Sequence, residues 1–334
     1  WVAPASPLGR RSEPPGSLEP DRWFSRDVRI GRGRMKTSTC DILVVGAGPA
    51  GSVAARAAAQ AGAKVLLVER RATVGLPVQC AELIPAMLLG QLKIPSELKN
   101  ASDFIAQRSE GMRTFLPGEG VHETRAPGYV IHRDRFDQML ADCAVEAGAE
   151  LVTATRALSK DHNGCVTLKP KGETAYCVHP RVIIGADGPH STVGGWAGRV
   201  NDHLLPGVQV TLPLKTPLTH TEIYFDPENP GGYAWLFPKK DVANVGLGLT
   251  RALAPPRAAR QLLDRFVARM VAEGKVADTP LAYAAGWIPA VPVRSAVAGN
   301  ILLSISHNGS PYSPESSISF TLRKAGSWRG SKLI

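Results

Sequence analysis

Residues 40–71, CDILVVGAGPAGSVAARAAAQAGAKVLLVERR, constrain the fold of this chain more than any other stretch. The continuous apolar run 42–45 is typical of a buried parallel strand, and the alanine-rich segment that follows, to about residue 61, is typical of a helix. A second apolar run, 65–68, predicts the next strand. The order strand, helix, strand therefore predicts an α/β domain built on a parallel sheet.

The turn between the first strand and the helix carries the pattern G-x-G-x-x-G. Gly46 permits a tight turn, Gly48 lets the backbone approach a pyrophosphate, and Gly51 lets the helix pack closely on the strand. The first turn of the helix, which includes Ala50, offers free N–H groups to phosphates. Glu69, at the end of the second strand, is placed to bind a ribose. The unit predicts a dinucleotide site but does not separate NAD from FAD.

Composition and charge exclude several classes of protein. The 334 residues are 44% hydrophobic and 20% charged, and no apolar run approaches the ~18 residues of a membrane span. The net charge of +10 is concentrated at the two ends, since residues 1–34 hold seven arginines against four acidic residues and 304–334 hold four basic residues against one. We therefore expect no nucleic-acid partner.

The five cysteines, at 40, 80, 143, 165 and 177, are dispersed and contain no C-x-x-C pair. This pattern argues against a disulfide framework and against a structural metal site, and it favours a reducing, cytoplasmic compartment. Contact with a membrane surface stays open. The first methionine is Met35, and residues 1–37 are rich in Pro, Gly, Ser and Arg, so we expect them to be a disordered, non-native extension.

Two later stretches bear on the choice of cofactor. The segment 129–151 contains R-x-x-F-D, starting at Arg133, and the segment 181–193 ends a buried strand in an A-D-G turn with Asp187. With the glycine unit, in this order, they resemble the FAD-dependent hydroxylase and reductase superfamily. The resemblance implies a Rossmann-type FAD-binding domain, of the glutathione-reductase or hydroxylase type, with an inserted antiparallel β-sheet substrate domain. It also places Arg133 and Asp187 beside the flavin nucleotide.

The stretch PGGYAWLFPK, residues 230–239, places Tyr233, Trp235 and Phe237 on alternate positions, so a strand there would carry all three rings on one face. Such a face is either part of an ordinary sheet core or an apolar wall for a ligand. The stretch fits P-x-x-Y-x-W-x-F-P, and VGLPVQCAELIP at 74–85 is similar to P-V-x-C-[GA]-E. Both motifs resemble those of the geranylgeranyl reductase family.

That resemblance implies FAD-dependent saturation of C=C bonds in a polyprenyl chain, a small-molecule substrate that the three rings would bind. The chain has no second G-x-G-x-x-G helix, so electrons would come from NAD(P)H or a reduced ferredoxin. An isolated alkene needs a proton with the hydride, and Cys80, Glu82 and Tyr233 are the candidate donors. In the family the cysteine lies at the reactive edge of the flavin, which favours Cys80. An FAD monooxygenase of an aromatic substrate and a non-catalytic remnant remain alternatives.

The expected organisation follows from these motifs. We predict an FAD-binding domain over 38–200, of which 75–125 partly lines the active site, a substrate domain over 201–284, and a return to the FAD domain over 285–303. Residues 304–334 lack the G-D-A-A-G turn that the resemblance implies, so we expect a truncated or frameshifted, aberrant tail and a weaker hold on FAD. The full set of residues predicted to bind the cofactor is Gly46, Gly48, Ala50, Gly51, Glu69, Arg70, Cys80, Ala81, Arg133, Ala157 and Asp187.

Overall fold

The structure is a computed structural model that describes residues 26–30, 33–91, 101–229, 231–250, 256–291, 293 and 295–303. The predicted tail, 304–334, lies outside the described residues, as does Pro230 of the aromatic motif. Within the segment predicted to be disordered, Arg26–Ile30 forms strand β1, which pairs antiparallel with residues 33–37.

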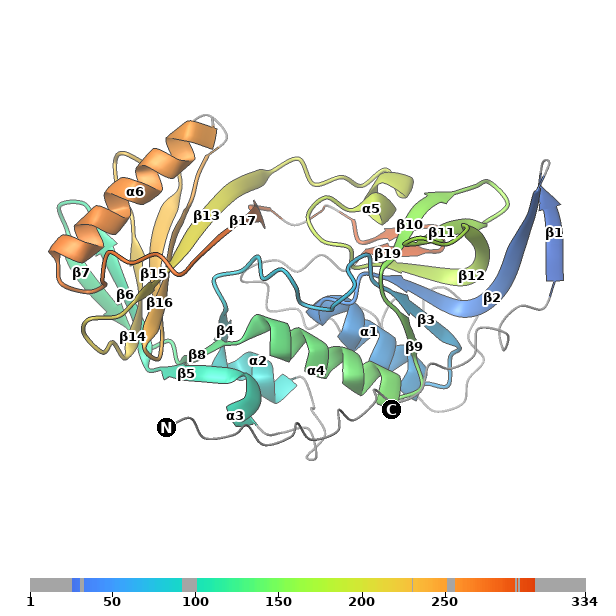
Figure 1. The fold of residues 1–334 in the computed structure, drawn as a ribbon, viewed down its shortest axis with the longest axis horizontal. Helices are drawn as coiled ribbons and strands as arrows, with labels where there is room; N and C mark the ends of the chain where they lie inside the picture. The colour runs from blue at the N-terminus through green and yellow to red at the C-terminus, as the bar shows by residue number, and fades with distance from the viewer. Residues whose placement is uncertain are drawn as a thin grey trace, which may run out of the picture.

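The larger sheet has nine strands (Figure 1). They are β1 (Arg26–Ile30), β2 (Gly33–Val45), β3 (Val65–Val68), β9 (Glu150–Val152), β10 (Thr155–Lys160), β11 (Val166–Pro170), β12 (Tyr176–Gly185), β18 (Val297–Ala298) and β19 (Ile301–Leu303). Strands β9, β3, β2 and β12 are neighbours in parallel pairing, and β19 adds in parallel to the end of β12. The parallel sheet predicted from the glycine unit is confirmed.

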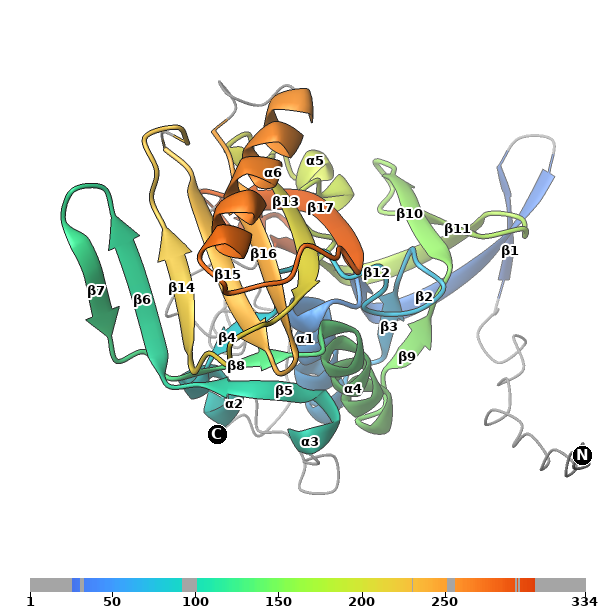
Figure 2. The same cartoon turned by 60° about the vertical axis from the view of Figure 1, so that its left-hand side comes forward.

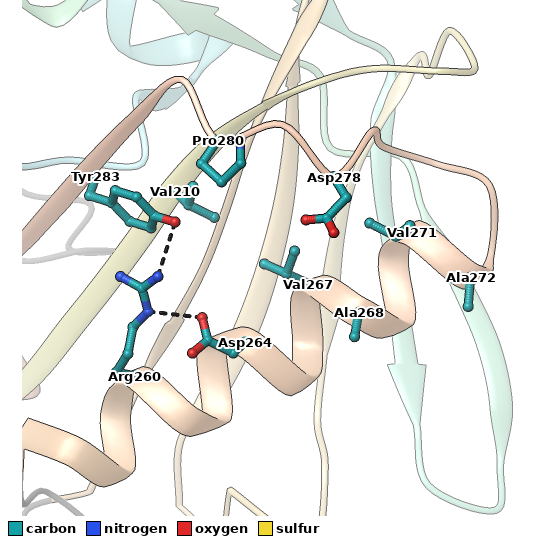
Figure 3. A pocket seen from close by; sticks show the side chains of 10 residues that line it. All are labelled: Val210, Arg260, Asp264, Val267, Ala268, Val271, Ala272, Asp278, Pro280 and Tyr283. Carbon is teal, nitrogen blue, oxygen red and sulfur yellow. Dashed lines mark hydrogen bonds and ion pairs between the residues drawn. The ribbon is translucent and has the colours of Figure 1, made fainter.

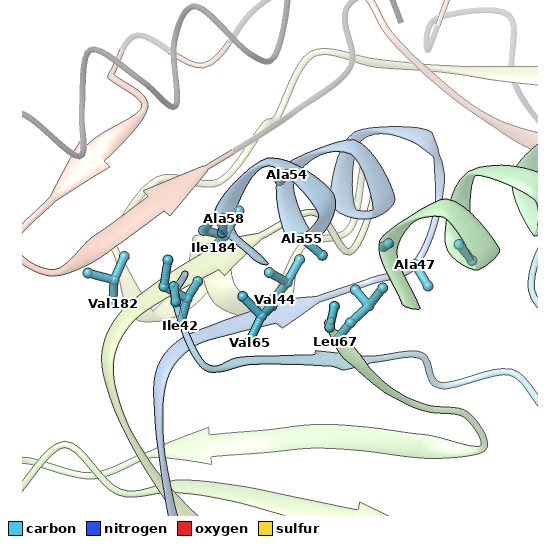
Figure 4. Packing of buried hydrophobic residues seen from close by; sticks show 14 of the residues in the cluster. Ile42, Val44, Ala47, Ala54, Ala55, Ala58, Val65, Leu67, Val182 and Ile184 are labelled. Atoms are coloured by element: carbon cyan, nitrogen blue, oxygen red, sulfur yellow. The ribbon is translucent and has the colours of Figure 1, made fainter. Parts of the chain in front are cut away.

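Helices α1 (Pro49–Gln60) and α4 (Arg133–Glu146) pack together on one face of this sheet. Figure 4 shows how Ala54, Ala55 and Ala58 of α1 lie against Val44 and Ile184. All five of these side chains are fully buried. Alanine side chains let the helix axis approach the strands closely, so the first glycine turn is held rigidly at the strand ends.

The second sheet has seven strands in the order β17-β13-β16-β15-β14-β6-β7. The bounds are β6 (Gly111–Leu116), β7 (Gly120–Thr124), β13 (Leu204–Pro213), β14 (His220–Tyr224), β15 (Tyr233–Lys239), β16 (Val242–Gly248) and β17 (Ala282–Pro289). All pairs are antiparallel except β14 with β6. Helix α6 (Pro256–Ala272) covers one face of this sheet and lies in front of β15 and β16 in Figure 2.

This mixed α/β architecture with an antiparallel second sheet agrees with the fold class predicted from the sequence. Strands β6 and β7 join the second sheet although they precede the segment 201–284 in the chain. The exact domain boundaries stay a prediction.

A third, three-stranded sheet lies between the two larger ones and consists of β4 (Leu83–Pro85), β8 (Gly128–Ile131) and β5 (Ile105–Ser109). The short helices α2 (Ala86–Gln91) and α3 (Ala101–Phe104) flank it in the chain, and α5 (Thr192–Trp196) follows β12. Val130 of β8 packs directly against Trp235 and Phe237. The rings on β15 therefore face the FAD-type half of the molecule, while the opposite face of the sheet packs on α6.

One expectation about the cysteines is wrong. Cys165 and Cys177 form a disulfide with a Cα–Cα distance of 5.7 Å, and Cys40, Cys80 and Cys143 are free. The antiparallel pairing of Thr167 with Cys177 puts Cys165 on the same face of the β11–β12 hairpin. A spacing of 12 residues does not reveal that hairpin in the sequence. Within the described residues, no helix is long and apolar enough to cross a membrane.

Candidate functional site

The glycine turn at the start of α1 is built without room for side chains. Gly46 has φ +100°, and a Cβ there would lie 2.3 Å from the carbonyl oxygen of Ala186. A Cβ at Gly51 would lie 1.8 Å from the carbonyl oxygen of Gly46. Both contacts are with backbone atoms, which cannot move aside, so these positions require glycine. Because Gly46 lies directly against Ala186, the glycine turn also packs on the A-D-G turn that follows β12.

The turn is open on its outer side. Gly48 is the N-cap of α1, Pro49 begins the helix, and a Cβ at Gly48 would meet no atom within 4 Å. The N–H groups of Ala50 and Gly51 lie in the first helical turn, where helix geometry provides no acceptor for them. Open space in front of free N–H groups at the positive end of a helix fits the pyrophosphate of FAD.

Glu69 lies beside the same turn. The backbone N–H of Ala47 donates to its Oε2 and the N–H of Arg71 donates to its Oε1, each at 2.9 Å. These bonds fix the carboxylate, and each oxygen keeps a lone pair for a ribose hydroxyl. The residues of this turn therefore fit a dinucleotide.

For three other predicted cofactor residues, the contacts in the structure do not point to a bound FAD. Asp187 accepts hydrogen bonds from the N–H groups of Thr192 (2.6 Å) and Val193 (3.2 Å) and from the hydroxyl of Ser191, so it caps α5. Arg70 is exposed, and Ala157 packs against the core on the sheet face opposite α1. A role in FAD binding stays a prediction for each of these residues.

A second set of predicted residues meets at the turn Cys80–Glu82, which joins the loop after β3 to β4. The N–H of Glu82 donates to Sγ of Cys80 at 3.2 Å. Glu82 is buried and has φ +70°, a conformation that costs a residue with a Cβ about 1–3 kcal/mol. Such a conformation persists only where the surroundings hold it.

Arg133 lies against this turn at the start of α4. Its Nε and one terminal nitrogen donate to Asp137 at 2.8 and 3.1 Å, and its backbone N–H donates to Oε1 of Glu82 at 3.0 Å. Burial lowers the pKa of the guanidinium, but interactions with Cys80 and Asp137 outweigh it and hold that pKa above its ordinary value. The turn thus has a permanent positive charge next to Cys80.

The three predicted substrate rings lie on one face of β15. Ring centroids are 5.8 Å apart for Tyr233 and Trp235 and 6.4 Å apart for Trp235 and Phe237. A Cβ at Gly246 on the neighbouring strand would lie 2.5 Å from the ring of Trp235, so the lack of a side chain there makes room for the indole. Trp235 and Phe237 are 5% and 7% exposed. Tyr233, which is half-buried, is the ring most open to a ligand.

The ring of Tyr233 is electrostatically linked to Cys80. Burial and the neighbouring Cys80 both raise the pKa of the Tyr233 phenol above its ordinary value. Its hydroxyl therefore stays protonated at neutral pH. Nε1 of Trp235 donates to Oε1 of Gln209 at 3.0 Å, and Nε2 of Gln209 donates to the carbonyl of Cys80 at 3.4 Å. The structure thus brings the Cys80 turn, Arg133 and the rings together.

Several residues at this junction were not predicted from the sequence. The ammonium of Lys239 lies 2.6 Å from Oε2 of Glu82, and Nδ2 of Asn244 donates to the same oxygen at 2.9 Å. Gln79 connects the loop to the sheet edge, since its Nε2 donates to the carbonyl of Ala285 at 2.9 Å. The one local signal for Lys239 is that it directly follows the last proline of the aromatic motif. The others belong to no sequence motif and become neighbours only through the fold.

A separate hollow of about 490 Å³ lies between α6 and the edge of the seven-stranded sheet (Figure 3). Arg260 bridges Asp264 and the hydroxyl of Tyr283 across it. Val210 lines this hollow and belongs to the core beneath α6, whereas the rings of β15 point to the other face. The hollow is therefore separate from the candidate site.

Comparison with known families gives two matches. A model described as "FAD binding domain" matches residues 39–203, and one described as "Geranylgeranyl reductase catalytic domain" matches residues 211–287. The first match contains the glycine turn, the Cys80 turn and Arg133. The second contains the three rings.

Individual proteins agree with these matches. The chain is 41% identical to digeranylgeranylglycerophospholipid reductase 1 of Methanopyrus kandleri, over 79% of this chain and 72% of that protein. It is 37% identical to a digeranylgeranylglycerophospholipid reductase of Methanothrix thermoacetophila, over 79% of this chain and 70% of that protein. A solved geranylgeranyl bacteriochlorophyll reductase-like protein of Thermoplasma acidophilum superposes with a TM-score of 0.71 at 29% identity, over 80% of this chain and 70% of that one.

Proposed function

Because this chain belongs to the geranylgeranyl reductase family, we propose that it saturates C=C bonds in the polyprenyl chains of a glycerophospholipid. The observation that carries the proposal is the junction at Cys80. On one side, Arg71 connects Glu69, beside the glycine turn that fits FAD, to Gln79, which precedes Cys80. On the other side, Gln209 connects Cys80 to Trp235 on the strand with three rings. The names of the relatives support a digeranylgeranyl glycerophospholipid as the substrate class.

The physical demands of this reaction agree with the residues present. FAD, when bound and reduced, supplies a hydride. A polyprenyl chain has no polar group along its length, so its binding rests on apolar contact, at roughly 0.8 kcal/mol per buried CH₂. Tyr233, backed by Trp235 and Phe237, offers such a contact next to Cys80. The half-buried position of Tyr233 supports a role in contacting the chain.

The proton for the second alkene carbon has two candidate sources at this point. The phenol of Tyr233 keeps its proton at neutral pH for the reasons given above, and Cys80 is the free thiol that is not fully buried. Arg133 and the N–H of Glu82 lie close enough to stabilise negative charge left on the sulfur of Cys80. We assign proton delivery to this pair of residues.

The alternative of an FAD monooxygenase is not favoured. Aklavinone-11 hydroxylase superposes with a TM-score of 0.63 but shares 18% identity, and the flavin-dependent halogenases CndH and CmlS share 18% and 19%. Likeness at this level reflects the fold alone. The match to a reductase catalytic domain over the substrate-side sheet likewise does not favour a non-catalytic remnant.

The test is direct reduction of a lipid. The purified protein, loaded with FAD and reduced anaerobically by dithionite, is incubated with digeranylgeranyl glycerophospholipid, and the lipid is analysed by mass spectrometry. We expect a gain of one H₂ for each bond reduced, and no change in the fully saturated lipid, which serves as the control. An unchanged digeranylgeranyl lipid, or a hydroxylated product on admission of air, would contradict the proposal.

Dithionite makes this assay independent of the natural electron donor, which we propose to be NAD(P)H or a reduced ferredoxin. Since the substrate is a membrane lipid, we also propose a peripheral contact with membranes. The exposed Leu281, Tyr283 and Trp287 on and beside the edge strand β17 support that contact.

A further inference from the structure

The Cys80–Glu82 turn is held by side chains from the seven-stranded sheet. Gln209 on β13 donates to the carbonyl of Cys80 at 3.4 Å, and Asn244 on β16 donates to the carbonyl of Ala81 at 3.3 Å. An ammonium on β15 completes the set, so three adjacent strands each place one donor on the turn. We call these three residues the turn clamp: Gln209, Lys239 and Asn244.

The strongest contacts of the clamp are to the carboxylate of Glu82. Lys239 contacts Oε2 at 2.6 Å, Asn244 donates to the same oxygen at 2.9 Å, and the N–H of Arg133 donates to Oε1 at 3.0 Å. The side chains of Glu82 and Lys239 are 6% and 13% exposed, so little water screens the pair. All three partners are donors. An ionised carboxylate accepts from all three and pairs with the ammonium, whereas a protonated one would lose that charge pair and add a buried O–H donor to a set made only of donors.

We propose that Lys239 is a positioning residue for the reduction. Its ammonium fixes Glu82 as an ionised anchor, and that anchor keeps the turn in its left-handed conformation with Cys80 next to Tyr233. Glu82 is accordingly not the proton donor, which leaves that task to Cys80 and Tyr233. The part of the inference that concerns catalysis rests on the proposed function, whereas the part that concerns the geometry of the turn rests on the contacts alone.

The clamp also links the aromatic face to the turn. Lys239 lies on the same strand as the three rings, and Asn244 is fixed by Thr211 at 3.0 Å. A polyprenyl chain that displaces the ring of Trp235 would act on the turn through Gln209. Displacements of about 1 Å at a reacting centre reduce rates by about 100-fold, so a modest loosening of this turn would be measurable.

The experiment compares four FAD-loaded variants with the wild type: Lys239→Met, Glu82→Gln, the double variant, and Lys240→Met. Lys240 is exposed and adjacent in the chain, so its substitution removes the same charge without touching the turn. The first readout is the rate at which iodoacetamide labels Cys80 in the native protein, since Cys40 and Cys143 are buried. The second is kcat and KM for the lipid.

We expect Lys239→Met and Glu82→Gln each to raise the labelling rate of Cys80 several-fold and to lower kcat by about 10- to 100-fold, with KM unchanged. The double variant is expected to be no worse than the more impaired single variant, because both substitutions break one interaction. Lys240→Met is expected to match the wild type. Wild-type labelling and kcat in Lys239→Met, or additive losses in the double variant, would overturn the proposal.

The single variant Lys239→Met leaves a buried carboxylate without its partner and so risks misfolding. The double variant removes both charges and keeps the test valid, with folding checked by flavin absorbance and thermal denaturation. If it folds and labels Cys80 at the wild-type rate, the clamp has no positioning role. If the wild type itself fails to reduce the lipid, the proposed function fails, and the labelling rates alone decide on the clamp.

Discussion

The neighbours of Tyr233 change the acidity of its phenol. Tyr233 starts strand β15 opposite Gly248 of β16, and its ring lies beside Trp235 and Ile288. Burial and Cys80 raise the pKa of its phenol. A phenol whose pKa is raised keeps its proton to a higher pH than an exposed tyrosine, whose pKa is about 10.

We predict that Tyr233→Phe lowers kcat for lipid reduction by roughly 10²- to 10⁴-fold, the usual contribution of a positioned general acid, with little change in KM. The wild-type rate should stay constant through neutral pH and fall only above the ordinary range of tyrosine, because deprotonation removes the donor. A pH profile of kcat measures both effects. Tyr176→Phe is the control, since Tyr176 packs against the core of the larger sheet, away from the rings of β15. A variant with wild-type kcat would assign proton delivery to Cys80 alone.

At the residue scale, sequence reasoning identified residues with motifs and missed residues without them. Cys80, Glu82, Arg133 and Tyr233 were predicted and meet at one junction, although their individual roles stay predictions. Lys239 contacts Glu82 at 2.6 Å, yet a lysine at the end of a strand is usually a solvated surface residue. Only its distance to Glu82, 157 residues away in the chain, distinguishes it.

The glycine turn and α1 act as one element, in which the backbone itself forms the ligand surface. Gly51 packs on the carbonyl of Gly46, whereas Gly48 faces open space. The two glycines therefore serve different purposes, one internal packing and the other access for the ligand. Alanine substitution at each position tests these two roles separately.

Gly51→Ala should lower the free energy of unfolding by roughly 3 kcal/mol, because its Cβ would overlap a carbonyl oxygen that cannot move. Gly48→Ala should cost less than about 1 kcal/mol, the usual effect of a changed helix cap. Its Cβ would instead occupy the space of the pyrophosphate, so FAD affinity should fall at least about tenfold. Denaturant titration and flavin fluorescence measure the two quantities. Equal destabilisation by both substitutions would contradict this division.

Strand β15 was predicted correctly as an element with three rings on one face. The sequence left open whether that face is a core or a ligand wall; the structure buries two of the three rings, and the ligand wall stays a prediction. Trp235 and Phe237 pack on Val130, and Tyr233 stays half-buried. The sequence could not settle this point because β8, which packs against the rings, lies about a hundred residues earlier in the chain. No local pattern reveals such a contact.

At the scale of the whole molecule, FAD binding and folding are coupled. The fold brings the glycine turn against the A-D-G turn at the ends of β2 and β12 and packs α4 beside α1, and none of these surfaces exists in the unfolded chain. A ligand that binds only the folded state stabilises it by an amount set by its concentration relative to Kd.

FAD at a hundredfold excess over its Kd should therefore raise the free energy of unfolding by about 2.7 kcal/mol. Riboflavin, which lacks the pyrophosphate and adenosine, should give little stabilisation at the same concentration, because the glycine turn would have nothing to bind. Thermal denaturation with each ligand makes the comparison. The Kd obtained in the same titration also tests the expectation of a weakened hold on FAD. Equal stabilisation by riboflavin would show that the glycine turn does not contribute.

The sequence by itself determined the parallel α/β sheet, the dinucleotide-binding glycine turn and, through several short motifs, the family, because each motif consists of residues close together in the chain. Short apolar runs, glycines at fixed spacing and alternating rings all express local backbone geometry. The tertiary structure alone decided that Gln209, Lys239 and Asn244 hold the Cys80 turn, and that Cys165 and Cys177 are paired. These contacts join segments that only the pairing of distant strands brings within hydrogen-bonding or covalent distance, and such pairing leaves no periodic trace in the sequence.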